Sequence, residues 1–293
     1  MDIRNIQKTG DMHYVYLPTS WCREHKVGAK SKVSLDQNSD GSINISPELT
    51  EKKPKHLKFH VTEDEPEAIH KLVVASYINP AASFEINMDK EMDFTKLINQ
   101  KRLISFESVE IDKKQITSEG SVTVADPGSL LKTMAKKIKN MIIVMQENYD
   151  KVLIQKYEDE IDRSKMLIEK SVIGSLTFGK TTKLKNIELY YIAHISKELE
   201  RLVDRLIMLE KGNSKFLDDI TKPIELLQNI LHDTANLDQK QTMEFAKSVI
   251  VIKKSDIKDV KDVRNYDMEI MRQNLTTISE VVMDWMVTLK LEN

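Results

Sequence analysis

The sequence predicts a multidomain α+β protein with three consecutive parts. Short apolar runs separated by turn residues fill the first 124 residues, whereas apolar residues recur at helical spacing from residue 126 onward. We therefore expect a small β domain over residues 1–50, a small α/β module over residues 56–124 and an antiparallel helical bundle over residues 126–293. A chain of 293 residues that is 40% hydrophobic is long enough for more than one core.

The N-terminal part is predicted to contain two hairpins and a short helix. Thr9-Gly10-Asp11 is a turn cluster between two apolar runs, and Asn38-Ser39-Asp40-Gly41 is another. Thr19 or Ser20 is placed to cap the helix. The expected elements are strands at 3–8, 14–17, 32–35 and 43–46 and a helix at 21–26. So small a unit has too little core of its own, which predicts an obligate dimer.

A linker rich in Lys and Pro at 51–55 precedes the middle module. Strand-like and helix-like segments alternate there, which is typical of a small α/β unit. The expected elements are strands at 57–61, 84–88, 104–111 and 116–124 and helices at 66–77 and 94–103.

The bundle is predicted to start at Asp126-Pro127-Gly128-Ser129, a helix-start signal. Apolar residues then recur three and four positions apart, which indicates the buried face of long helices. The first such stripe consists of Leu131, Met134, Ile138, Met141, Ile142 and Met145. Because methionine also suits adaptable binding grooves, this stripe is either core or a groove, and core is the expectation.

Composition excludes several classes of protein. The longest purely apolar run, 141–145, is far shorter than the roughly 20 residues that span a bilayer, so no membrane insertion is expected. The first residues form no signal-peptide pattern, which predicts a cytoplasmic protein. The single cysteine, Cys22, excludes an intrachain disulfide and a cysteine-rich zinc site. There is no Gly-rich phosphate loop and no nucleophile motif, so we do not expect an enzyme.

Pairs of carboxylates at i, i+4 recur on separate predicted helices. They are Glu158 with Asp162, Glu200 with Asp204 and, more weakly, Glu280 with Asp284. Like charges one helical turn apart repel each other, so a cation between them would offset the repulsion. Divalent or trivalent metal ions prefer such oxygen ligands.

Helical geometry at about 100° per residue places these pairs at or beyond the edge of each apolar stripe, so any metal site is expected at the bundle surface. The alternative is a solvated face with salt bridges, since Lys197 precedes Glu200 by three residues and Arg201 precedes Asp204 by three.

The head resembles a known DNA-binding domain. The segments 6–10, 14–21, 27–33 and 40–47 match, in order and spacing, the AbrB/SpoVT swapped-hairpin domain. The resemblance implies a dimer with interlocked hairpins and basic side chains that face DNA. By position these side chains are Arg4, Lys8, Arg23, Lys26 and Lys30. Residues 1–60 carry ten Lys/Arg against seven Asp/Glu, a mild excess that permits contact with a phosphate backbone.

The bundle resembles a second family. The stretches 158–163, 167–170 and 195–204 look like the two signature helices of a PhoU repeat, whose carboxylate motifs bind metal ions. The first repeat spans about 129–211. The second, about 220–291, is degraded, because its partner helix offers only Asp256, Asp259 and Asp262. An AbrB-like head and a PhoU-like tail together resemble the archaeal phosphate uptake regulators.

The resemblances imply a dimeric regulator of phosphate uptake that binds DNA and carries iron, zinc or magnesium. A rival reading is an adaptor of the PhoU type that acts on a phosphate ABC transporter or its regulators without binding DNA. A metal-carboxylate hydrolase is the third possibility, which the expected exposure of the carboxylates disfavours.

Overall fold

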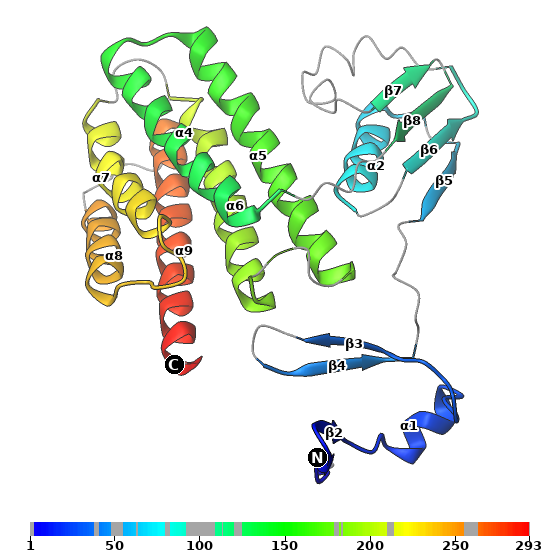
Figure 1. The fold of residues 1–293 in the computed structure, drawn as a ribbon. Helices are drawn as coiled ribbons and strands as arrows, with labels where there is room; N and C mark the ends of the chain where they lie inside the picture. Colours follow the sequence, from blue (N-terminus) through cyan, green and yellow to red (C-terminus); the bar gives the residue numbers. More distant parts are fainter. Residues whose placement is uncertain are drawn as a thin grey trace. The chain divides into compact units, whose positions relative to one another are not determined.

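The computed structural model describes residues 3–37, 41–47, 55–62, 64–79, 83–91, 109–112, 114–119, 125–178, 182, 184–209, 214–254 and 263–292. The chain separates into two compact units, Met1–Lys53 and Pro54–Asn293 (Figure 1). Helices and small sheets occur together, which confirms the predicted α+β class.

The first unit contains two hairpins around the predicted turns, but the strand expected at 14–17 lies earlier, at Met12–Tyr14. Its elements are β1 (Gln7–Thr9), β2 (Met12–Tyr14), α1 (Thr19–Glu24), β3 (Ser34–Gln37) and β4 (Ile43–Ser46). Strands β1 and β2 pair antiparallel, as do β3 and β4. Gly10 makes the first turn with a φ of 60°, a left-handed conformation that glycine adopts without steric cost. The predicted cap of α1 is wrong: Pro18 holds the N-cap position, and Thr19 and Ser20 are helical residues.

Among its described residues, the first unit has no core of its own. Every described side chain between residues 3 and 47 is at least partly exposed. Many large apolar side chains lie on its surface: Ile3, Ile6, Met12, Tyr14, Val15, Tyr16, Leu35 and Ile43. Burial of such side chains is the main source of folding free energy. A single copy of this unit therefore lacks the buried apolar contacts that stabilise a domain.

In its described residues, the second unit begins with a four-stranded sheet and the helix α2. Its elements are β5 (His56–Val61), α2 (Pro66–Ile78), β6 (Ser83–Met88), β7 (Val109–Asp112) and β8 (Gln115–Glu119). The strand order is β5-β6-β8-β7, with β5 parallel to β6 and the other pairs antiparallel. Ile69 and Val73 of α2 form a buried cluster with Phe84, Ile86 and Ile116 of the sheet. The predicted helix at 94–103 lies outside the described residues.

The described residues that follow form helices α4 to α9, coloured from green to red in Figure 1. They are α4 (Pro127–Glu147), α5 (Lys151–Phe178), α6 (Asn186–Leu206), α7 (Ser214–Ile230), α8 (Gln239–Lys254) and α9 (Val263–Glu292). Asp126 caps α4, because its Oδ2 accepts a hydrogen bond from the Ser129 amide at 2.8 Å. Among the described residues, no helix is long and apolar enough to cross a bilayer.

One continuous core joins these helices. The predicted stripe of α4 is buried throughout, so the interpretation of Met134, Met141 and Met145 as core residues is confirmed. Helix α5 packs on α4 and α6, and α6 packs on α9. This packing brings α5, α6 and the N-terminal half of α9 together around the candidate site.

Helix α5 also contacts the sheet module. Met166 packs against the core that α2 forms with the sheet. One turn further along, the Lys170 Nζ lies 4.0 Å from the ring centroid of Tyr77 on α2, a cation–π distance. Burial lowers the pKa of Lys170, because a desolvated ammonium loses hydration.

Candidate metal centre

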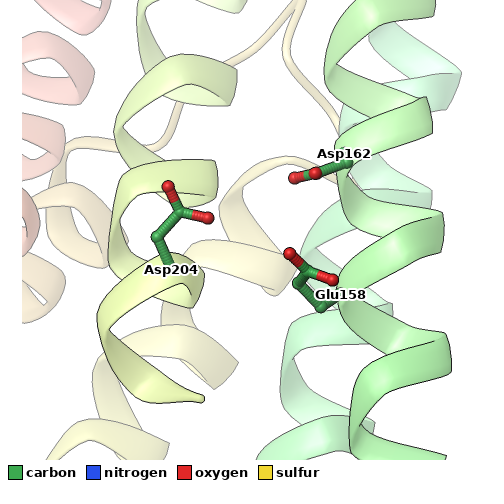
Figure 2. A group of neighbouring side chains, drawn as sticks. All are labelled: Glu158, Asp162 and Asp204. Carbon is green, nitrogen blue, oxygen red and sulfur yellow. The ribbon is translucent and has the colours of Figure 1, made fainter. Parts of the chain in front are cut away.

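Three carboxylates from two neighbouring helices converge in the bundle. Helix α5 supplies Glu158 and Asp162, which lie one turn apart, and α6 supplies Asp204. One oxygen from each lies within 4.8 Å of the others. Figure 2 shows the three carboxyl groups turned toward one another across the space between the helices.

The centre lies deeper than the helical periodicity predicted. Glu158 is only 5% exposed, and Asp162 and Asp204 are half-buried. Gln155, one turn before Glu158, donates a hydrogen bond from its Nε2 to Glu158 Oε2. The expected surface location is therefore wrong for Glu158, because α6 packs on α5 and the Glu158 side chain is buried.

The spacing of the oxygens suits a single ion. Metal–oxygen bonds of Mg²⁺ and Ca²⁺ are about 2.0–2.6 Å long, so oxygens on opposite sides of one ion are about 4–5 Å apart. A separation of at most 4.8 Å therefore lets all three carboxylates reach the same cation. Carboxylates at this distance also repel one another, and a bound cation reduces that repulsion.

Not all the predicted ligands join this group. Glu200 is half-buried on α6, one turn before Asp204, and lies outside the three-carboxylate group. In the second repeat, Glu280 and Asp284 are exposed on α9. Their predicted partners Asp256, Asp259 and Asp262 lie outside the described residues. Within the described part of the chain, the only group of three or more such side chains close enough to share an ion lies in the first predicted repeat.

The expected salt bridge between Arg201 and Asp204 is replaced by a different pair. Arg201 Nη1 lies 2.7 Å from Glu198 Oε1, and Glu198 is almost fully buried. Arg205, one turn later, reaches across to α9, where its Nη1 lies 3.2 Å from Asp267 Oδ1. Arg201 and Arg205 thus pair with acids outside the three-carboxylate group.

A cavity of about 550 Å³ adjoins the carboxylates. Glu158 and Asp204 line it together with Arg201 and Arg205, and Gln273 and Asn274 of α9 complete its polar lining. Its volume is in the range of small-molecule sites. The expectation that these carboxylates are exposed and have no pocket is therefore wrong. Their exposure is no longer an argument against a metal-carboxylate hydrolase.

The residues predicted to contact DNA are all exposed. Arg4 precedes β1, Lys8 lies in β1, and Arg23 lies in α1. Lys26 and Lys30 follow α1 with φ values of 53° and 70°, a left-handed conformation that is uncommon for residues other than glycine. Each side chain is accessible to a polyanion.

Comparison of the chain with protein-family models, with curated proteins and with solved structures finds no match.

Proposed function

We propose that this chain is a homodimeric, cytoplasmic transcriptional regulator of phosphate uptake, with a DNA-binding head and a metal centre in its helical bundle. The resemblance of the head to AbrB/SpoVT domains and of the bundle to PhoU repeats supports the two activities. The observation that carries the proposal is the convergence of Glu158, Asp162 and Asp204 from two helices, because these are the motif residues for which the resemblance implies metal ligation.

The metal centre would take a divalent or trivalent cation that prefers oxygen ligands, such as iron, zinc or magnesium. Glu158 is a buried carboxylate with two more carboxylates beside it. A bound cation lowers the cost of burying a carboxylate among like charges.

The exposed apolar surface of the head supports dimerisation. Residues such as Ile6, Val15 and Leu35 are more than half exposed in a single copy, and a second copy of the same hairpins would cover them. A two-fold dimer also presents its basic residues twice, which suits a duplex with paired half-sites.

Metal analysis tests the bundle. The variant Asp162→Asn/Asp204→Asn should lose at least half of the metal of the wild-type protein, because two of three charged ligands become neutral. Elemental analysis of the purified full chain measures this. Glu147→Gln/Glu244→Gln removes two exposed negative charges from α4 and α8, outside every predicted metal site, and is the matched control. Equal metal content in the wild type and the Asp162/Asp204 variant would contradict the centre.

A mobility-shift assay tests the head. Arg4→Ala/Lys8→Ala should weaken DNA binding on all sequences and reduce its salt dependence, as loss of phosphate contacts does. Lys240→Ala/Lys247→Ala removes two exposed positive charges from α8 and is the control. The promoter of a phosphate transporter, at two salt concentrations, is the natural target. Absence of DNA binding by the wild type would favour the adaptor that acts through a transporter or its regulators.

A further inference from the structure

The cavity beside the carboxylates contains two guanidinium groups. Arg201 and Arg205 lie one turn apart on α6, and both line the same space as Glu158 and Asp204. Acidic and basic groups therefore share one cavity, which is unlike a site that holds a cation alone.

Buried carboxylates fix both arginines. Glu198 and Asp267, each 6% exposed, hold Arg201 and Arg205 through one Nη1 each. A guanidinium has five N–H groups, and within the described part of the chain each of these two donates to a single carboxylate oxygen. The remaining donors are available to a ligand. Because a carboxylate partly neutralises each arginine, the two arginines offer a ligand directed hydrogen bonds more than net positive charge.

A metal ion favours the binding of an anion beside the carboxylates. Glu158 and Asp204 line the cavity and Asp162 lies beside them, and their carboxylate oxygens repel an anionic ligand. A divalent or trivalent ion weakens that repulsion. Such ions take about six oxygen ligands or more, so positions remain after three carboxylates have bound.

A tetrahedral oxyanion fits both parts of this arrangement. One or two of its oxygens can occupy open positions on the metal, and its other oxygens can accept hydrogen bonds from guanidinium groups, which suit phosphate geometry. The cavity of about 550 Å³ also has room for an organic group attached to the phosphate.

We propose that the metal-loaded centre binds a phosphate group in this cavity, held by the metal ion and by Arg201 and Arg205. The proposal rests on the metal centre proposed above. The phosphate belongs either to inorganic phosphate or to a phosphomonoester. Binding is ordered, with the metal first, and phosphate must tighten metal binding by the same factor by which metal tightens phosphate binding.

Equilibrium dialysis of the full chain tests this in two steps. The chelator-treated protein is first loaded with Mn²⁺, a probe that prefers carboxylate and water ligands, and bound Mn²⁺ is measured. Retention of radiolabelled inorganic phosphate is then compared between metal-free and Mn²⁺-loaded protein, and glucose 6-phosphate is used as a competitor. We expect phosphate to be retained by the Mn²⁺-loaded protein alone. Stronger competition by the sugar phosphate than by unlabelled phosphate would assign the site to phosphomonoesters.

Arginine variants connect the binding to the cavity. Arg201→Lys/Arg205→Lys keeps the charges that neutralise Glu198 and Asp267 but removes the planar fork, and it should weaken phosphate binding about tenfold while Mn²⁺ binding stays within about twofold. Lys197→Gln removes an exposed charge from the same helix outside the cavity and should change neither affinity.

The possible failures are distinct. If the wild-type protein binds no Mn²⁺, the metal centre and the phosphate site both fall. If Mn²⁺ binds but phosphate is not retained, the metal centre stands and the phosphate site is wrong. Equal retention by metal-free protein, or unchanged phosphate binding in the arginine variant, would also overturn the proposal.

Discussion

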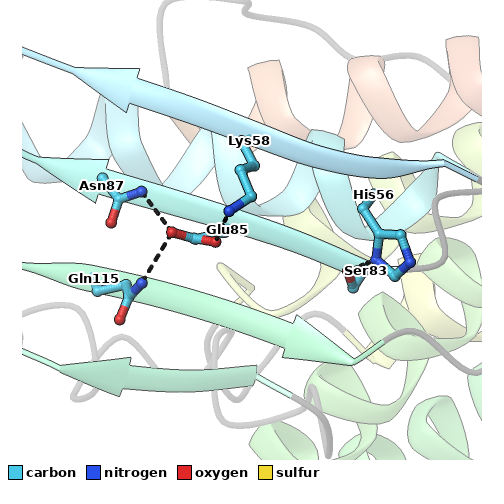
Figure 3. Close-up of polar contacts among 6 residues, drawn as sticks. All are labelled: His56, Lys58, Ser83, Glu85, Asn87 and Gln115. Carbon is cyan, nitrogen blue, oxygen red and sulfur yellow. Dashed lines mark hydrogen bonds and ion pairs between the residues drawn. The ribbon is translucent and has the colours of Figure 1, made fainter.

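At the scale of single residues, the ionisation of a carboxyl group depends more on its hydrogen-bond partners than on its position along the sequence. Glu85 on β6 is an example outside the candidate centre (Figure 3). Its Oε1 accepts hydrogen bonds from Asn87 Nδ2 at 2.8 Å and Gln115 Nε2 at 3.1 Å. Lys58 Nζ lies 3.0 Å from its Oε2. The hydrogen bond from Asn87, followed by those from Lys58, lowers the pKa of Glu85, since all of them stabilise the ionised form.

This network predicts a pH dependence. A lowered pKa in the folded state means that ionised Glu85 stabilises the fold above the ordinary glutamate pKa, and that this contribution is lost as the pH falls through the lowered value. An NMR titration of the Glu85 side-chain carboxyl carbon should therefore have its midpoint below the ordinary value. Asn87→Ala should raise the midpoint, and Glu110→Gln on the edge strand β7 should leave it unchanged. A midpoint at the ordinary value in the wild type would refute the network.

The same scale explains what could be predicted of the candidate centre. The i, i+4 spacing identified Glu158, Asp162 and Asp204, because one helical turn determines which residues share a face. It could not separate Asp204 from Glu200, whose positions differ by about 40° around the helix. The crossing of α5 and α6 decides which of them faces the partner helix. Asp267 had no local signal either, since it reaches Arg205 from 62 residues away.

At the scale of elements, helix α5 connects the candidate centre to the sheet module. Asp162, Met166 and Lys170 follow one another at intervals of four along it, so one stripe carries a carboxylate of the centre and two residues that contact the sheet module. The sequence predicted the helix and the sheet, because periodicity and turn residues are local. Their contact depends on two segments that are far apart in the chain, and no periodicity encodes it.

Met166→Ala should loosen the sheet module from α5. Truncation of a partly buried methionine removes apolar contact worth about 1–2 kcal/mol, less than at a fully buried site. Hydrogen exchange should therefore speed up in α2 and β6 and stay unchanged in α6 and α9. Val152→Ala is the control on the same helix, because Val152 is 69% exposed. Equal protection of α2 in both variants would mean that Met166 does not hold the module.

At the scale of the whole molecule, the two units differ in how they reach stability. The second unit has two buried clusters, one in the sheet module and one in the bundle. The first has none among its described residues and exposes Ile3, Ile6 and Tyr16 at its surface. The sequence anticipated this difference from the size of the head alone, since so few residues cannot enclose a core.

This difference predicts that the head makes the dimer. In sedimentation experiments at micromolar concentration, the full chain should be a dimer. In a purified sample, a second copy of the chain is the partner that can cover the apolar side chains of the head. A chain that starts at residue 54 should be a folded monomer with unchanged helical circular dichroism, since its cores lie within one copy.

Ile6→Asp/Val15→Asp in the full chain should also give a monomer, because charges at these exposed apolar positions oppose burial against a second copy. Lys240→Ala/Lys247→Ala should remain dimeric. A monomeric wild type, or a dimeric chain without the head, would place the contact between copies elsewhere and remove the structural argument for paired half-sites on DNA.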